Sequence, residues 1–455
     1  MQEKIKAGAA KVDITPPLGT LINGDFITHY ATHIHNSLFA KALVLQSGNI
    51  IIAICVVDIC AMRREFLDEV KILVQQQTGI SPQNILISST HTHASGSVES
   101  LLLGHADLPY RQKLTALIVQ AIVQAKHKLV NAKIGFGSIN APEYALCRRY
   151  QMQPGYEAKN PVTGDLDQVK TNPFGAEDQI IKPVSKPDTQ LCYLAIKNEQ
   201  DEWLSILGNY SMHYVGDWEN GTISADYFGE FSDQLKKILK AGDDFVAMLS
   251  NGTSGEVNVW DFLNSNRFPK AKFEKSRLIG GDLAEKVYQS LHQIQWQTEL
   301  ALAIQYADVP IKVRKPDAEM LATAQKTVAA SNYEQLQGYN YETLQKIYAR
   351  ELVLLNEYPE TINFPVQAFK IGETIIGGLG GEFFAETGLA LKDKHQQYFT
   401  ITLANGYVGY VCPEHEIARG GYETWLCRTS YLEVGAEAII QRKLQKMIAD
   451  FNSTD

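Results

Sequence analysis

The order of apolar and polar blocks near the N-terminus predicts two strands, a helix and a third strand. Residues 40–46 and 50–57 are rich in β-branched and aliphatic residues and flank a Ser-Gly-Asn turn, so they predict paired strands. Residues 63–78 have helical periodicity, and residues 84–88 predict the next strand. This order predicts a parallel pair of strands joined by a crossover helix.

The predicted helix over residues 63–78 has both a clear apolar face and a clear end. Its apolar residues Phe66, Val70, Leu73 and Val74 follow the spacing i, i+4, i+7 and i+8, which places them on one side of a helix. Gly79 comes directly after this pattern and is a suitable C-terminal stop, because glycine readily adopts the left-handed backbone found there. The segment is therefore expected to pack one face on a sheet.

The same alternation continues to the C-terminus. Further helices are predicted over residues 111–129, 228–239, 276–294, 384–393 and 436–451. Further strands are predicted over residues 133–139, 245–249, 300–313 and 399–403, and hairpins over 190–207 and 364–379. Residues 316–357 predict a helical insertion of two helices. The expected fold class is α/β, a large mixed β-sheet flanked by helices with an inserted helical pair.

One long polar segment interrupts this pattern. Residues 151–187 are rich in Pro, Gly, Asn and Asp and carry no strand or helix signal. Loops of this length inside compact domains often serve as lids over a site, and a surface excursion away from any site is the alternative. We treat the segment as a candidate lid loop.

Charge and apolar runs exclude several classes of function. The net charge of −9 disfavours a nucleic-acid partner, because phosphate binding needs a basic face. No run approaches the roughly 18 apolar residues of a transmembrane segment. The N-terminus has no apolar core of a signal peptide, so the chain is expected to be cytoplasmic, or periplasmic or secreted if a leader has been removed. The six scattered cysteines are expected to be reduced core residues.

Candidate catalytic chemistry is concentrated just after predicted strands, where ligand sites of α/β sheets assemble. The residues concerned are His91, His93, His213, Glu382, Tyr407 and Tyr410. Two imidazoles and a carboxylate with an open position make a catalytic zinc site of the His2Glu type. Each residue alone also fits a structural role, as a hydrogen-bonded histidine pair, a core histidine or a carboxylate at a helix start.

A set of motifs along nearly the whole chain resembles the neutral/alkaline non-lysosomal ceramidase family. The matching stretches are AGAAKVDITPP from Ala7, HNSLFAKALVL from His35, SSTHTHASG from Ser88, CRRY from Cys147, ISADYFGE from Ile223, NGTSGEVN from Asn251, GLGGEFF from Gly378, LANGYVGYV from Leu403 and GGYE from Gly420. The combination of THTH, GGE and two tyrosines twelve residues apart is specific.

The resemblance implies a role for seven residues. It implies that His91, His213, Glu382 and Tyr410 are the ligands of one Zn²⁺ ion. It implies that His93 is a catalytic residue beside the metal-activated water. It implies that Tyr422 steadies the reacting carbonyl and that Arg148 is a pocket arginine, although the adjacent Arg149 leaves open which of the two faces the pocket.

The sequence departs from the family in two places. The family carries a serine in a Gly-Asp-Val-Ser-Pro-Asn motif, whereas Asn258 stands at that position here, which disfavours a serine nucleophile although Ser254 lies nearby. The family also carries a C-terminal immunoglobulin-like domain, and the chain is expected to lack one. Both departures bear on the substrate more than on the zinc chemistry.

We therefore predict that residues 1–455 form a single zinc-hydrolase catalytic domain that cleaves an N-acyl amide bond. The expected partner is a small-molecule N-acyl substrate, either a lipid such as ceramide or an amino sugar. A zinc esterase or lactonase, or a sugar N-deacetylase, would use the same site, because one activated water can attack amides and esters alike. A non-catalytic metal-binding protein is the third reading, and His93 and Tyr422 argue against it, because a purely structural zinc needs neither.

Overall fold

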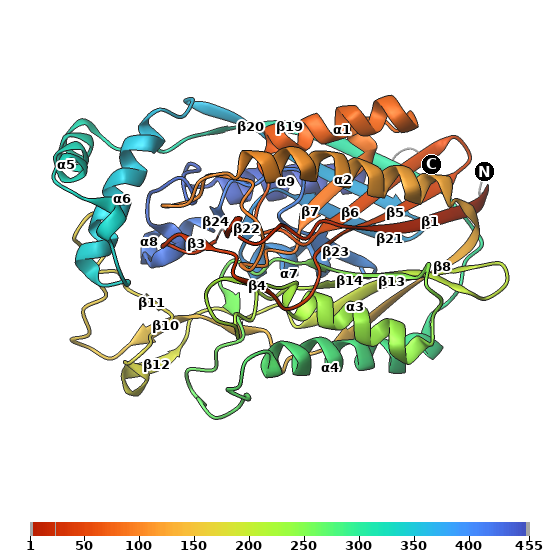
Figure 1. Ribbon diagram of the computed structural model, residues 1–455, viewed down its shortest axis with the longest axis horizontal. Coiled ribbons are helices and arrows are strands. Elements are labelled where there is room, and N and C mark those ends of the chain that lie inside the picture. Colours follow the sequence, from red (N-terminus) through yellow and green to blue (C-terminus); the bar gives the residue numbers. More distant parts are fainter. Residues whose placement is uncertain (1–2, 23, 452–455) are drawn as a thin grey trace.

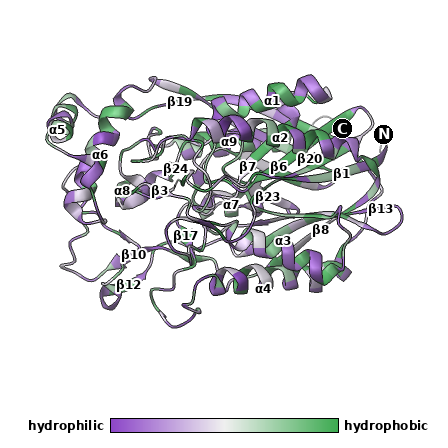
Figure 2. Ribbon diagram, in the orientation of Figure 1, coloured by the Kyte–Doolittle hydropathy of each residue, from purple (hydrophilic) through white to green (hydrophobic). Residues whose placement is uncertain are grey.

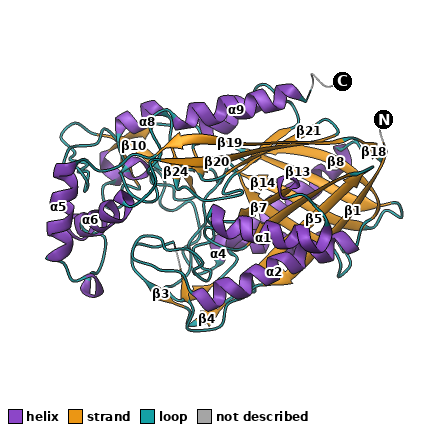
Figure 3. Ribbon diagram, turned by 90° about the horizontal axis from the view of Figure 1, so that it is seen from above, coloured by secondary structure: helices purple, strands orange, loops and turns teal. Residues whose placement is uncertain are grey.

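Two stacked β-sheets with helices on both outer faces form the core of the protein (Figures 1 and 3). The computed structural model describes residues 3–22 and 24–451, so both ends of the predicted domain lie outside the described residues. The predicted α/β fold with a large mixed sheet flanked by helices is confirmed. Within the described residues, no helix is long and apolar enough to cross a membrane.

The larger sheet has the strand order β16-β14-β13-β8-β1-β5-β6-β7, with β18 beside β1. Its strands are β1 (Glu3–Asp13), β5 (Phe39–Ser47), β6 (Ile50–Val57), β7 (Ile85–Ser89), β8 (Val130–Asn140), β13 (Gln190–Asn198), β14 (Trp203–Tyr210), β16 (Val246–Asn251) and β18 (Glu299–Leu300). Two neighbouring pairs, β6–β7 and β14–β16, are parallel, and the others are antiparallel. The parallel pair β6–β7 confirms the crossover predicted from the sequence.

The smaller sheet has the order β19-β20-β21-β23, and its last pair is parallel. Its strands are β19 (Leu302–Lys312), β20 (Thr361–Ile371), β21 (Thr374–Leu379) and β23 (Tyr398–Ile401). One face packs on the larger sheet, because residues such as Phe369 and Phe399 share a fully buried cluster with Leu43 and Ile54 of the larger sheet. Each such side chain contributes about 1.5–3 kcal/mol by leaving water, so this layer joins the two sheets firmly.

Helices cover the two outer faces. Along the larger sheet lie α1 (Arg64–Thr78), α2 (Leu108–His127), α3 (Asp226–Leu239) and α4 (Glu274–Ser290), and along the smaller sheet lie α7 (Ala385–Lys392) and α9 (Ala436–Asp450). Figure 2 shows hydrophobic residues gathered in the central strands and hydrophilic ones on the outer turns of the helices. As predicted, α1 buries Phe66, Val70 and Val74, and Gly79 ends it in the left-handed conformation with φ 74°.

Strand β1 lies in the middle of the larger sheet, yet the sequence did not predict it. It pairs with β5 from Ile5 opposite Ser47 to Asp13 opposite Phe39. Its sequence is rich in Ala and Gly, which have low strand propensity. A Cβ at Gly8 would lie 2.2 Å from the carbonyl oxygen of Ala125 in α2, so a small residue is needed there for the helix to approach the strand. Close packing of a helix therefore overrides local propensity in this strand.

The predicted helical insertion is present as α5 (Ala318–Ala329) and α6 (Tyr341–Asn356), which lie between β19 and β20 at the end of the molecule opposite both chain termini (Figure 1). Short elements complete the chain: β2 (Leu21–Ile22), β3 (His29–Tyr30), β4 (His33–Ile34), β9 (Leu146–Cys147), β15 (Thr222–Ile223), β17 (Val257–Asn258), β22 (Glu382–Phe383), β24 (Tyr410–Val411) and α8 (Glu414–Arg419). All six cysteines are buried and free, as expected.

The segment 151–187 is more ordered than its composition indicates. Strands β11 (Lys170–Thr171) and β12 (Ile180–Pro183) both pair with β10 (Arg149–Met152) to form a small three-stranded sheet. The expectation of a segment without strands is therefore wrong. Pairing with β10, which precedes the segment, supplies the backbone hydrogen bonds that local propensity does not signal.

A buried lysine near the junction of the two sheets should make the stability of the protein depend on pH. Lys71 Nζ donates to Asn405 Oδ1 at 2.7 Å, and Asn405 Nδ2 donates to Gln367 Oε1 at 2.7 Å. Burial lowers the pKa of Lys71 to about 7, below the value of about 10.4 for an unfolded chain. Between these values the unfolded chain binds more protons, so folding gains stability as pH rises.

The Lys71→Met variant should lose this gain. Relative to the variant, the wild type should gain about 2 kcal/mol in unfolding free energy between pH 7 and pH 9, measured by urea denaturation at both values. The exposed Lys446 on α9 offers the control variant Lys446→Met, which should follow the wild type. A constant difference between wild type and Lys71→Met across this range would contradict the prediction.

Candidate active site

Three side chains from the ends of different strands converge in the interior. His91 lies two residues after β7, His213 three residues after β14, and Glu382 three residues after β21. All three are buried. The histidines thus follow the larger sheet and the carboxylate follows the smaller one, so the stacking of the sheets brings them together.

These three residues are arranged as metal ligands would be. His213 Nε2 lies 2.9 Å and His91 Nε2 lies 3.5 Å from the same oxygen, Oε2 of Glu382. One ligand atom from each of the three residues lies within 4.8 Å of the others. The group could therefore hold one metal ion between two imidazole nitrogens and a carboxylate.

The pKa values of these three residues depend strongly on one another. Burial opposes the charged form of every member, but the interaction of Glu382 with the histidines outweighs it and holds the pKa of this carboxyl well below its usual range. The same carboxylate raises the pKa of His91 well above its ordinary value. Burial, followed by the charge of Arg148, lowers the pKa of His213 to about 4. Glu382 thus carries the negative charge that a cation at this position would balance.

The backbone at His91 is held in an unusual conformation. Its φ of 69° is left-handed, which costs a residue other than glycine about 1–3 kcal/mol. Hydrogen bonds maintain it: the backbone N–H of His91 donates to Ile59 O at 3.0 Å, and its Nδ1 lies 2.7 Å from Cys60 O. A proton on Nδ1 leaves Nε2 free to accept a metal ion, and fixing a ring in this way is typical of metal-ligating histidines.

The position of Glu382 is fixed by a hydrogen bond to its other carboxylate oxygen, Oε1, and by the pairing of its strand. Tyr407 donates its hydroxyl to Oε1 of Glu382 at 2.8 Å, and burial together with the carboxylate raises the pKa of Tyr407 well above its ordinary value, so it remains a donor. Strand β22, which contains Glu382, pairs in parallel with β24, and Tyr410 is its direct partner. The sequence included Tyr407 among the candidates without giving it this role.

His93 lies against the ligand group without belonging to it. Its Nε2 is 3.3 Å from Nε2 of His91, and its ring stacks on Tyr214 with centroids 3.8 Å apart. Burial, followed by the charge of His91, lowers the pKa of His93 well below its ordinary value. The unprotonated form of His93 is thus favoured beside the group of His91, His213 and Glu382.

Of the two adjacent arginines, Arg148 faces the site. Its Nη2 donates to Tyr410 Oη at 3.1 Å, and its guanidinium lies 5.5 Å from the ring centroid of Tyr410 and 6.0 Å from that of Tyr422. Arg149 instead donates to Glu423 and Glu416 at 2.7 and 2.8 Å. This answers the question that the sequence left open.

Glu423 fixes the position of Arg148, and the sequence did not identify it. One carboxylate oxygen accepts from Nε of Arg148 at 2.8 Å, while the other accepts from Arg149. The residue directly follows Tyr422, whose ring meets Tyr410 edge to face at 5.5 Å. Burial raises the pKa of Tyr422, which keeps its hydroxyl protonated and able to donate. All seven residues implied by the resemblance thus lie in one neighbourhood.

The candidate lid segment 151–187 is bound to the loop that carries Tyr422. Trp425 Nε1 donates to Asp167 Oδ2 at 2.7 Å, and Thr171 Oγ1 donates to Glu423 Oε2 at 2.8 Å. Asn258 Nδ2 donates to Asn172 Oδ1 at 2.8 Å. These contacts place the segment at the rim of the site, and its function as a lid remains a prediction.

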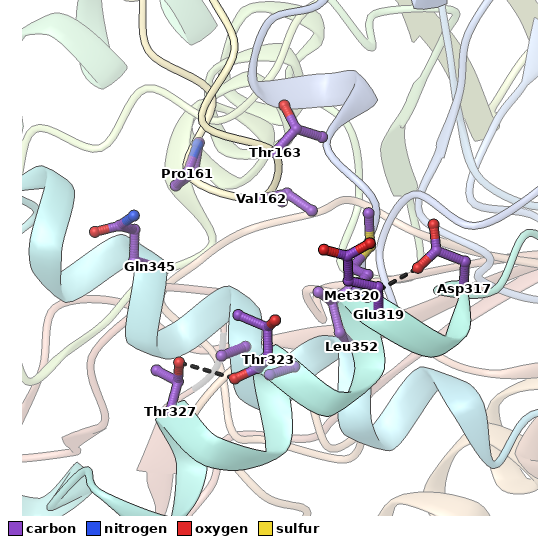
Figure 4. A pocket seen from close by; sticks show the side chains of 12 residues that line it. Pro161, Val162, Thr163, Asp317, Glu319, Met320, Thr323, Thr327, Gln345 and Leu352 are labelled. Carbon is purple, nitrogen blue, oxygen red and sulfur yellow. Dashed lines mark hydrogen bonds between the residues drawn. The ribbon is translucent and has the colours of Figure 1, made fainter.

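A separate pocket of about 350 Å³ lies between residues 161–163 and helices α5 and α6 (Figure 4). Met320 and Leu352 line it together with polar side chains such as Thr323 and Gln345, and none of the candidate ligands does. This pocket is therefore separate from the candidate active site.

No protein-family model matches the sequence, and no curated protein matches it. Among solved structures, the neutral ceramidase from Pseudomonas aeruginosa superposes on 98% of this chain and 74% of its own with a TM-score of 0.71, at 18% sequence identity. The chain has the neutral ceramidase fold. A second structure, a ceramidase complexed with C2, covers 99% of this chain and 76% of its own with a TM-score of 0.73 at 16% identity. The neutral ceramidase resemblance in the sequence motifs is thus confirmed by the fold.

Proposed function

We propose that the protein is a zinc-dependent hydrolase of N-acyl amide bonds, as its neighbour in structure is a neutral ceramidase. The observation that carries the proposal is the convergence of His91, His213 and Glu382, with the ring of His93 directly beside them. A metal-binding protein without catalytic function has no need of His93 or of a cation such as Arg148 next to the ligands.

The residues present fit a zinc ion. Two imidazole nitrogens and a carboxylate oxygen are the donor set of many catalytic zinc sites. Nδ1 of His91 is engaged by the carbonyl of Cys60, which directs Nε2 toward Glu382. Nδ1 of His213 is buried and without a hydrogen-bond partner among the described residues, so Glu382 is the group that orients this ring. In the proposal Tyr410 completes the set, since its strand pairing brings it beside Glu382.

The proposed reaction adds water across the amide. The water oxygen bonds to the carbonyl carbon, the C–N bond breaks, and the products are a carboxylic acid and an amine. A bound zinc ion supplies Lewis acidity toward the carbonyl and lowers the pKa of water to about 7. His93 Nε2 accepts a proton from the attacking water and returns it to the leaving nitrogen. Tyr422 and Arg148 donate to the carbonyl oxygen as it gains charge, at about 3 kcal/mol for one such donor.

The contacts of Ser254 and Asn258, in the stretch that differs from the family motif, argue for water as the nucleophile. Ser254 donates its hydroxyl to Asn251 at 2.8 Å, and Asn258 is engaged with Asn172 and with the backbone N–H of Trp260. Neither makes a hydrogen bond to a candidate ligand among the described residues. Water, which needs no side chain of its own, is consistent with this arrangement.

The test is a panel of N-acyl amides and matched esters that differ only in acyl length, assayed with the zinc-loaded protein. We expect amide hydrolysis, and we expect kcat/KM for a C2-acyl amide to exceed that for its C16-acyl analogue. The reason is that the segment at the rim is polar and each buried methylene returns only about 0.8 kcal/mol. Hydrolysis of esters alone would identify an esterase or lactonase, and a clear preference for C16 would identify a ceramidase in the ordinary sense.

A further inference from the structure

A pocket of about 160 Å³ opens directly on His93 and is not explained by metal binding or by the chemistry of the bond that breaks. The side chains that define its character are Asp25, His29, Tyr214, Trp218, Asn220 and Trp260. They come from β3 and the loop before it, the loop after β14 and the segment after β17. Aromatic rings and polar groups therefore predominate in this pocket.

The aromatic rings form flat, partly open walls. Tyr214 stacks on His93, and Trp218 lies 6.1 Å from Tyr214 between ring centroids. Trp260 is held edge to face by Phe174 at 5.1 Å. Tyr214, Trp218 and Trp260 are each only partly buried, so part of each ring remains open to a ligand. A flat aromatic surface next to hydrogen-bonding groups suits a ring whose faces carry C–H bonds and whose edge carries hydroxyls.

The polar side is built around a carboxylate that is fixed in place. Asp25 accepts from the hydroxyl of Tyr339 at 2.8 and 2.9 Å, and His29 Nε2 lies 3.0 Å from Asp25 Oδ2. Tyr339 comes from the connection between α5 and α6, so the helical insertion reaches the pocket through this contact. The backbone N–H of Phe26 also donates to Asp25 Oδ1 at 2.7 Å. Three donors thus contact a carboxylate with about four lone-pair sites, which leaves room for one hydrogen bond from a ligand.

The pocket is small, at about 160 Å³. The pocket fits one small ring or a short acyl group, and its polar lining would leave an alkyl chain poorly desolvated.

We propose that this pocket binds the hydroxylated ring of an N-acylated amino sugar, so that the amide nitrogen of the sugar lies toward His93. The ring packs on Trp218 and Trp260, and one of its hydroxyls donates to Asp25. The sugar amine is then the leaving group of the hydrolysis described above. This inference rests on the proposed function and specifies its substrate class.

The test compares two acetylated amines of similar ring size, N-acetylglucosamine and N-acetylcyclohexylamine, which lacks the hydroxyls. With zinc-loaded wild-type protein, kcat/KM from free-amine release should be at least about tenfold higher for the sugar, the difference expected from one hydrogen bond to a charged group. Asp25→Asn should lower kcat/KM for the sugar about tenfold or more and leave the value for the cyclohexyl compound nearly unchanged, because only the sugar has hydroxyls to donate. Trp218→Ala should lower kcat/KM for both compounds, because both rings present C–H faces to the indole. The distant Trp296→Ala serves as the control and should match the wild type.

The outcomes separate this inference from the proposed function. Equal or better turnover of the cyclohexyl compound, an equal loss on both compounds in Asp25→Asn, or no loss on the sugar in Trp218→Ala would overturn the sugar pocket and leave the amidase intact. Turnover of long-chain N-acyl amines but of neither acetyl compound would do the same. Failure on all N-acyl amines would remove the proposed function and this inference with it. If Trp218→Ala does not fold, the test rests on kcat/KM of Asp25→Asn and on calorimetric binding of glucosamine to the wild type. A normal kcat/KM in Asp25→Asn together with no glucosamine binding would contradict the proposal.

Discussion

His93→Ala should retain the metal and lose turnover by on the order of 10²-fold or more, because it removes a proton acceptor without removing a ligand. His93 Nε2 lies next to His91 Nε2, yet His93 is not a member of the group formed by His91, His213 and Glu382. The measurement is zinc content by elemental analysis alongside kcat for the preferred N-acyl amide. Zinc content should equal that of the wild type.

The control for this variant is the replacement of an exposed histidine. His127 at the end of α2 is exposed, so His127→Ala should keep both metal and activity. Loss of zinc from His93→Ala would make His93 a ligand, and unchanged kcat would show that it takes no part in proton transfer.

His213→Ala should lose both zinc and activity, whereas the wild type should hold about one zinc per chain, as expected for a mononuclear site. The reason is that Nε2 of His213 lies 2.9 Å from Glu382, and removal of the ring opens one side of the ligand group. His91→Ala is expected to behave in the same way, and the double variant should contain no zinc. Activity and elemental analysis are measured on the same samples.

Glu382→Gln provides the matched test of charge at nearly constant shape. The amide keeps one acceptor oxygen for the Tyr407 hydroxyl but removes the negative charge that balances a cation. Metal content should fall while the thermal unfolding profile stays that of a folded protein. Full zinc occupancy in His213→Ala or Glu382→Gln would place the metal elsewhere.

Much of the architecture could be predicted because its signals are local. The apolar spacing of Phe66, Val70 and Val74 and the stop at Gly79 identify α1 without reference to the rest of the chain. Strand β1 could not be predicted, because its small residues are required by the close approach of α2 at Gly8 and give no local strand signal. The strands β11 and β12 depend on pairing with β10 and carry no local pattern.

For the site, placement after strands was enough to propose His91, His213 and Glu382, because the carboxyl ends of strands in α/β sheets are where sites form. The proposed role of Tyr410 came only from the family resemblance, since tyrosine is an uncommon zinc ligand. The roles of Glu423 and Asp25 were not accessible from sequence. Each depends on a contact between segments hundreds of residues apart, such as Glu423 with Arg148 or Asp25 with Tyr339.

The position of the ligand group between two sheets has a mechanical consequence. Its histidines are attached to the larger sheet and its carboxylate to the smaller one, so a cation held by all three ties the two layers together across their shared apolar interface. Binding free energy at such a point adds to the cohesion of the layers, and slippage of one layer over the other separates the ligands. The ion would thus stabilise the contact between the two sheets as well as take part in the reaction. The packing that holds the sheets in register would in turn affect the affinity for the ion.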